Sequence, residues 1–220
     1  LVASNKLAQE RGACTAYPQT KYSEGILPID TYKKDIDKVV KAELQYDWEA
    51  LRVQIKEHGL RHSTLSAQMP SESSSVVSNA TNGIEPPRGF LSVKKSKKGP
   101  LKQVVPQYSQ LKNFYTLLWD MPNNDGYINV VAAMQKFFDQ SISGNWSYNP
   151  LHFENNEVPM SVMMKDMLTT YKLGWKTSYY QNTYDFKGDE DKEAAVEEQP
   201  LMNGSTLPVL EDDECEACNI

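Results

Sequence analysis

Two tyrosines stand side by side in the stretch KTSYYQNTYD, at positions 179 and 180. Successive side chains of a regular strand point to opposite faces, so packing alone would bury one ring and leave the other in solvent. A phenol can lose an electron and a proton together, and two stacked phenols can pass a radical between them. Tyr179 and Tyr180 are therefore candidates for radical transfer. The plainer alternative is a strand end with one ring buried and one at the rim.

A second candidate site lies in MPSESSSVVSN, where a predicted strand runs directly into a predicted helix. Its residues are Pro70, Ser71, Glu72, Ser73 and Ser74. Free N–H groups and the positive end of the helix dipole attract anions at a helix N-terminus, and serine hydroxyls add donors, so a phosphate would fit there. Ordinary capping by Ser71 or Ser73 is the alternative.

The third candidate is a dithiol, Cys215-x-x-Cys218, close to the last residue. A dithiol on a mobile arm could reduce a disulfide in an active site by thiol exchange and then be re-reduced itself. Half of a zinc site and an incidental pair are the alternatives. The three histidines show no ligand spacing, so no metal site is predicted. Cys14 stands alone and is expected to be a buried thiol.

Charge divides the 220 residues into two parts. The net charge is −6, but twelve acidic residues against two lysines give 185–220 a charge of −10 and leave 1–184 at +4. Such a charged, apolar-poor segment cannot offset its ordering entropy, so 185–220 is predicted to be a flexible acidic tail. Because no apolar run approaches the roughly 20 residues of a membrane span and no secretory signal opens the chain, a cytoplasmic protein is expected.

Helices alternate with short strands in the predicted elements, which favours an α/β architecture. Strands are predicted at 63–69, 141–148 and 175–181, and a hairpin at 90–105 with its turn at 94–99. Helices are predicted at the opening residues, after GILPIDTYKK, from the Asp47 cap to Gly59, from the serines to Asn82-Gly83, and from Pro159 to Gly174. Further helices are expected around apolar stripes at Leu111, Phe114, Tyr115 and Leu118, and at Tyr127, Val130, Val131, Met134, Phe137 and Phe138; the Pro159 helix has a stripe at Met163, Met167 and Tyr171.

Several long strings occur together in a fixed order: RHSTLSAQMPSESSSVVSNATNGIEPPRGF, MQKFFDQSIS, YYQNT and a terminal cysteine pair. Together with ASNKLAQERGAC and GILPIDTYKKD, they make the chain resemble the C-terminal portion of the large, catalytic subunit of class Ia ribonucleoside-diphosphate reductase, of the bacterial or phage type. The resemblance implies part of a ten-stranded α/β barrel built from two antiparallel half-barrels, incomplete in this chain. It also implies reduction of ribonucleoside diphosphates to deoxyribonucleotides.

The resemblance also implies a role for each candidate. Tyr179 and Tyr180 would relay a radical supplied by the small, metal-containing subunit, and their rings should meet where the strand departs from a flat pleat. The segment 70–74 would hold the substrate diphosphate, with Ser73 where threonine is common. Cys215 and Cys218, spaced more closely than in some members, would re-reduce the active-site disulfide and be reduced by thioredoxin or glutaredoxin.

Other parts of such an enzyme are expected to lie outside this sequence. The resemblance places the thiyl cysteine and the ATP and dNTP effector sites in an N-terminal portion, so no cofactor is expected in this chain and the chain alone is expected to be inactive. A homodimer of the full-length subunit is implied, and no nucleic acid or membrane partner is expected. The competing hypothesis is a non-enzymatic phosphate-binding or partner-docking module whose dithiol exchanges with thioredoxin.

Overall fold

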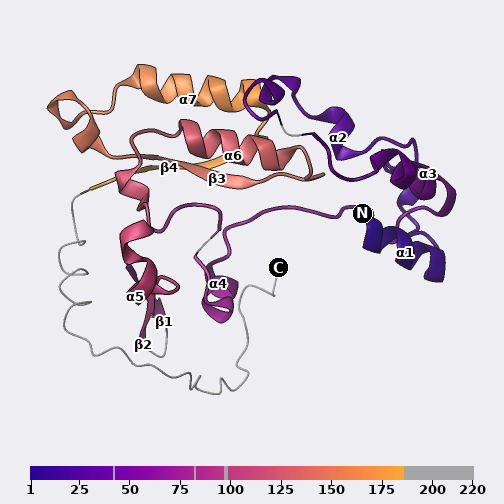
Figure 1. Ribbon diagram of the computed structural model, residues 1–220, viewed down its shortest axis with the longest axis horizontal. Helices are drawn as coiled ribbons and strands as arrows, with labels where there is room; N and C mark the ends of the chain where they lie inside the picture. Colours follow the sequence, from indigo (N-terminus) through magenta and orange to yellow (C-terminus); the bar gives the residue numbers. More distant parts are fainter. Residues whose placement is uncertain (42, 82, 97–98, 186–220) are drawn as a thin grey trace.

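The computed structural model describes residues 1–41, 43–81, 83–96 and 99–185 (Figure 1). Its helices are α1 (Val2–Arg11), α2 (Pro28–Thr31), α3 (Trp48–His58), α4 (Glu72–Ser78), α5 (Tyr108–Leu111), α6 (Asp125–Gln135) and α7 (Met160–Leu173), and its strands are β1 (Leu91–Ser96), β2 (Gly99–Val104), β3 (Ser143–Tyr148) and β4 (Thr177–Thr183). The mixture of helices and strands confirms the α/β class. Within the described residues, no helix is long and apolar enough to span a membrane.

The strands of the described part form two separate sheets and no closed barrel: β1 pairs with β2 antiparallel, and β3 pairs with β4 parallel. A parallel pair requires a crossover connection, and α7 supplies it. Figure 1 shows α6 and α7 running alongside the β3–β4 pair, with the β1–β2 hairpin apart from it. The predicted hairpin and the two strands around 141–148 and 175–181 are thereby confirmed.

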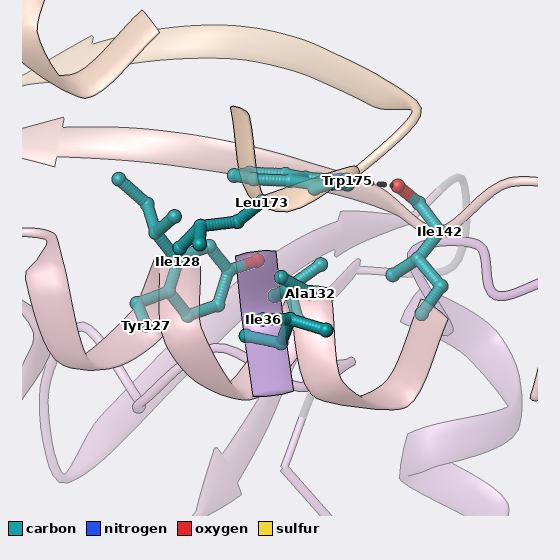
Figure 2. Close-up of a cluster of buried hydrophobic side chains, with 8 residues drawn as sticks. Ile36, Tyr127, Ile128, Ala132, Ile142, Leu173 and Trp175 are labelled. Carbon is teal, nitrogen blue, oxygen red and sulfur yellow. Dashed lines mark hydrogen bonds between the residues drawn. The ribbon is translucent and has the colours of Figure 1, made fainter. Parts of the chain in front are cut away.

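One hydrophobic core joins α6 to the segments that enter β3 and β4. Its buried members are Ile36, Tyr127, Ile128, Val131, Ala132, Ile142, Leu173 and Trp175. Figure 2 shows the Trp175 ring beside Leu173, with its indole N–H donating to the carbonyl of Ile142 at 2.7 Å. This bond satisfies the polar edge of a ring that is otherwise packed in the core.

A second core holds the N-terminal helices together. It consists of Tyr22, Leu27, Ile29, Leu51, Ile55 and Leu60. The Asp47 carboxylate accepts from the N–H of Ala50 at 2.9 Å, so α3 begins at the predicted cap, and it ends at Gly59 with φ of 75°. Asn5 of α1 is buried and donates to the carbonyl of Gly59 at 2.9 Å, which fastens α1 to the end of α3.

The predicted strand at 63–69 is wrong. Among these residues, all of which are described, Gln68 alone forms a bridge, pairing parallel with Ile142. The reason is that the Asp139 carboxylate accepts from the N–H groups of Leu65 and Ser66, both at 2.8 Å. Backbone donors that a ladder would use are bound to a side chain instead.

Two predicted helices differ in length from the observed ones. The serine-rich helix α4 ends at Ser78 because Asn79 adopts a left-handed conformation (φ 50°), short of the expected Asn82-Gly83 stop. A continuous helix through Leu111 to Leu118 is also wrong: α5 ends at Leu111, and the N–H of Leu118 donates to the carbonyl of Pro87 at 2.9 Å instead of to the preceding turn. Phe114, expected in the core, is 82% exposed.

The apolar stripes of the last two long helices are shifted relative to prediction. On α6, Tyr127 and Val131 are buried as expected, but Val130 is exposed. On α7, Met167 and Tyr171 are exposed, and the buried residues are Asp166, Thr170 and Leu173. Hydrogen bonds determine which face of α7 is buried. Asp166 accepts from Asn124 (2.9 Å) and from Tyr148 (3.1 Å), and Thr170 accepts from Trp146 (3.2 Å).

A substitution at Gly144 in β3 can test how tightly this core is packed. A β-carbon there would lie 2.7 Å from Cζ2 of Trp175 and would also meet the Tyr127 hydroxyl. Gly144→Ala is expected to lower the free energy of unfolding by about 1–3 kcal/mol, because the rings of Tyr127 and Trp175 must move away from the added methyl group. Urea denaturation of the chain measures this loss.

Gly126→Ala is the matched control. A β-carbon at Gly126 meets no atom within 4 Å, and the residue lies in the first turn of α6. Its free energy of unfolding should stay the same or rise by up to about 1 kcal/mol, because alanine favours a helix. Equal losses for the two variants would contradict the packing argument.

Candidate functional site

A β-bulge in the β3–β4 pair brings the two tyrosines together. Gly144 pairs with Ser178 and Trp146 pairs with Gln181, so Asn145 alone stands opposite both Tyr179 and Tyr180. An extra residue on one strand breaks the strict alternation of side chains and bends the strand. The predicted departure from a flat pleat at this position is confirmed.

The two phenol rings of the bulge are in contact. Their centroids are 4.2 Å apart, and the rings are tilted by 55° instead of lying parallel. The hydroxyl of Tyr180 donates to the hydroxyl oxygen of Tyr179 at 3.4 Å. Tyr179 and Tyr180 are 55% and 58% exposed in this chain, so the alternative of one buried ring and one rim ring is wrong.

The hydroxyl of Tyr180 stays protonated at neutral pH. The hydrogen bond with Tyr179, followed by its charge and by a small desolvation, raises the pKa of Tyr180 above the ordinary value of a tyrosine. A protonated phenol holds the proton that must leave together with an electron. The arrangement is therefore suited to the exchange of a hydrogen atom between two oxygens.

Asn145 connects the bulge to the loop that precedes β1. Its side-chain oxygen accepts from the N–H of Tyr180 at 2.9 Å, and its side-chain nitrogen donates to Oε1 of Glu85 at 2.6 Å. Burial raises the pKa of Glu85, against the opposing effects of the Asn145 hydrogen bond and the Arg88 charge. A partly desolvated carboxyl group thus lies one side chain away from the tyrosine pair.

The serine-rich turn lies at the junction that the sequence predicts, between an extended segment and α4. Ser71 occupies the N-cap position, and its hydroxyl donates to the carbonyl of Met69 at 3.4 Å. Pro70 and Ser74 are exposed on either side of it, and α4 begins at Glu72 and includes Ser73. The helix start is confirmed, and phosphate binding at it remains a prediction.

The serine-rich turn and the tyrosine bulge both follow segments that pair in parallel with the stretch from Ile142 through β3, the first by a single bridge and the second along a strand. Gln68 pairs with Ile142, so Ser71 and Asn145 each lie three residues beyond a paired position. The bulge on β4 stands opposite Asn145. In parallel sheets ligands bind beyond the carboxyl ends of the strands, which is the direction in which the chain runs from Gln68 into the serine-rich turn.

The Asp139 carboxylate fixes the segment that leads into the turn. Besides the N–H groups of Leu65 and Ser66, it accepts from the hydroxyl of Tyr22 at 3.0 Å. Burial alone would raise the pKa of Asp139, but the hydrogen bonds from Ser66, Leu65 and Tyr22 outweigh it and hold the pKa below its usual range. Ionised Asp139 is thus the form that the fold prefers.

The cysteines fall in different parts of the chain. Cys14 is half-buried, less than the buried thiol expected, and its N–H donates to the carbonyl of Leu60 at 2.9 Å. Cys215 and Cys218 lie outside the described residues. Among the residues that the structure describes, no group of three or more His, Cys, Asp or Glu side chains gathers in a way that could hold a metal ion.

Sequence reasoning missed Asn145, Glu85 and Asp139. A signal for the first existed, because glycine inside a strand marks a bulge or a close approach, and Gly144 directly precedes Asn145. Nothing local marks Glu85 or Asp139, whose partners lie 60 and 73 or more residues away in the sequence.

The fold and the site together define an α/β chain in which a parallel strand–helix–strand unit carries two contacting phenols at a bulge. The family model described as "Ribonucleotide reductase, barrel domain" matches residues 1–181, and the chain belongs to this family. The chain is 57% identical to ribonucleoside-diphosphate reductase 1 subunit alpha of Salmonella typhimurium, over 100% of this chain and 28% of that protein. The corresponding alpha subunits of Haemophilus influenzae and Enterobacteria phage T4 are 61% and 44% identical, over 87% and 99% of this chain and 25% and 28% of those proteins. The chain thus spans about 28% of the length of the Salmonella relative.

Asp139→Ala is expected to destabilise the chain by about 3 kcal/mol, because two backbone N–H groups and a phenol lose their acceptor. The exposed Asp120→Ala is the control and should change stability by less than about 0.5 kcal/mol. Urea denaturation at neutral pH measures both.

The Asp139 contribution should also depend on pH. Because the folded pKa is depressed, the stability difference between the native chain and Asp139→Asn is fully present above the ordinary aspartate pKa of about 4 and declines as the pH falls through the folded value. A difference that grows on acidification would contradict this assignment.

Proposed function

We propose that this chain forms part of the catalytic subunit of an enzyme that reduces ribonucleoside diphosphates to 2'-deoxyribonucleoside diphosphates by a radical mechanism. The observation that carries the proposal is the contact between Tyr179 and Tyr180 at the bulge, in a chain of the ribonucleotide reductase barrel family. Adjacent strand residues do not share a face unless the strand is irregular, and here they lie 4.2 Å apart.

The tyrosines act as a two-member relay. When one of them is a phenoxyl radical, the other gives up an electron from its ring and the proton of its hydroxyl, so the first becomes a phenol and the second a phenoxyl. The hydrogen bond between the hydroxyls of Tyr180 and Tyr179 supplies the path for the proton. Because both rings are exposed in this chain, each can be reached from outside, by the small radical-generating subunit on one side and by the barrel's thiyl cysteine on the other.

The serine-rich turn at 70–74 is the proposed site of the substrate diphosphate. Its support is the position of the turn, three residues after Gln68 pairs with Ile142, just as Asn145 opposite the bulge lies three residues after Ile142. Backbone N–H groups at the start of α4 and serine hydroxyls are donors suited to phosphate oxygens. Asp139 keeps the approach to this turn in place.

The remaining assignments rest on the family. Residues 1–184 belong to a ten-stranded α/β barrel of two antiparallel half-barrels, to which this chain contributes the β3–β4 pair, and residues 185–220 are its acidic redox tail. In the tail, Cys215 and Cys218 reduce the barrel's active-site disulfide and are themselves reduced by thioredoxin or glutaredoxin. The full-length subunit is a cytoplasmic homodimer, and ATP or dNTP effectors bind its other regions.

Tyr180→Phe in the full-length subunit, assayed with its small subunit, is expected to abolish turnover. Phenylalanine keeps the ring but has no hydroxyl proton to give up, so the relay is interrupted while nucleotide binding is unchanged. Tyr171→Phe, on the exposed face of α7, is the control and should retain full activity. Normal turnover by Tyr180→Phe would refute the relay.

Cys215→Ser should separate chemistry from re-reduction. The pre-reduced variant is expected to complete its first turnover at the normal rate and then stop when thioredoxin is the reductant, because the tail no longer carries a dithiol. A small-molecule dithiol in excess should restore continuous activity. Cys14→Ser should keep thioredoxin-dependent turnover, and a Cys215→Ser variant that does the same would contradict the role of the tail.

A further inference from the structure

At the bulge that brings the tyrosines together, β4 needs a hydrogen-bond partner that the regular ladder of β3 does not supply. Where two residues of β4 face one residue of β3, the regular ladder cannot supply a partner for every backbone group. The N–H of Tyr180 is at this point, and the side-chain oxygen of Asn145 accepts from it at 2.9 Å. A side chain thus takes the place of a backbone carbonyl at the one position where the ladder is interrupted.

A second hydrogen bond, to Glu85, holds the side chain of Asn145. Its amide nitrogen donates to Oε1 of Glu85 at 2.6 Å, across 60 residues of sequence. The amide therefore uses its acceptor on Tyr180 and a donor on Glu85, and the two bonds together fix the direction of the side chain. Aspartate could supply only the acceptor, and leucine neither.

Tight packing at the neighbouring residue, Gly144, further limits the movement of Asn145. Asn145 follows Gly144, where Trp175 and Tyr127 leave no room for a β-carbon. The backbone of β3 is therefore pressed closely against the core at the residue before Asn145. Burial, followed by the charge of Glu85, raises the pKa of Tyr127.

We infer that Asn145 is a positioning residue for radical transfer: bound to Glu85, it holds the backbone of Tyr180 so that the two phenols meet. The inference rests on the proposed function of the tyrosine pair. Asn145 contacts the backbone of Tyr180 and no reacting oxygen, so it acts through geometry alone. A displacement of about 1 Å at a reacting pair can cost about 100-fold in rate.

Asn145→Leu in the full-length subunit, assayed with its small subunit, tests the inference. We expect kcat to fall by about 100-fold, while the Kd of the nucleoside diphosphate is unchanged. A structure of the variant should show the ring centroids of Tyr179 and Tyr180 farther apart than 4.2 Å. Asn113→Ala, which removes an exposed amide from the 3₁₀ helix at Lys112–Phe114, should keep full activity.

Exchanging the carboxylate and the amide between Asn145 and Glu85 tests whether kcat can be recovered. Asn145→Asp retains the acceptor for Tyr180 but sets a carboxylate against Glu85, so it should lose activity as Asn145→Leu does. Adding Glu85→Gln supplies an amide that can donate to the new carboxylate, and the double variant should recover most of kcat. If Asn145→Leu does not fold, the isosteric Asp variants decide the question in its place.

The outcomes separate this inference from the proposed function. If Tyr180→Phe is inactive while Asn145→Leu turns over normally with its rings in place, the relay holds and the role of Asn145 is refuted. If Tyr180→Phe is active, the proposed function fails, and the ring separation in the Asn145→Leu structure still reports on the geometry. A loss of kcat that the double variant does not recover would refute the link to Glu85.

Discussion

Two neighbouring residues of one strand can meet only if the strand stops alternating. The β4 strand does so by carrying one residue more than β3 between two paired positions, and the additional residue places Tyr179 beside Tyr180. A bulge leaves backbone groups without ladder partners, and unpaired groups are costly where water is excluded. The bond from Tyr180 to the Asn145 side chain resolves this at the N–H that the bulge displaces. The geometry of the candidate site therefore depends on a hydrogen bond that no regular sheet would contain.

The rest of the unit keeps β3 rigid beneath the bulge. On the helix side, the buried carboxylate of Asp166 accepts from Asn124 and Tyr148, and Asn124 accepts from the N–H of Ser147 at 3.0 Å. These bonds join α7, the start of α6 and β3 into one polar network inside a largely apolar core. Polar networks of this kind favour one arrangement of a core, because a shifted register would leave several polar groups unpaired. The network explains why α7 turns Asp166 inward and leaves Met164 and Met167 exposed.

The sequence predicted most of the elements that hold the site and fewer of the contacts within it. Helix starts were predicted correctly where nearby residues alone determine them, as in the cap of α3 by Asp47 and the start of α4 after Pro70. Prediction failed where a distant side chain competes for backbone donors, as Asp139 does over 63–69. The apolar period of α7 was equally misleading, because Asp166 lies on the buried face of that helix. Such contacts depend on partners dozens of residues away, which no short window contains.

The parallel arrangement also relates the two candidate sites to each other. Because Gln68 pairs with Ile142 directly before β3, and β4 pairs along β3, one stretch of chain determines the positions of both the serine-rich turn and the tyrosine bulge. Asp139, which precedes β3, holds the segment that leads into the turn, and Asn145, within β3, holds the bulge. A shift of β3 along its axis would therefore move the turn and the phenols together. Their relative placement is better preserved than if each were carried by a separate loop, and the proposed transfer of a radical to a bound substrate requires such a fixed placement.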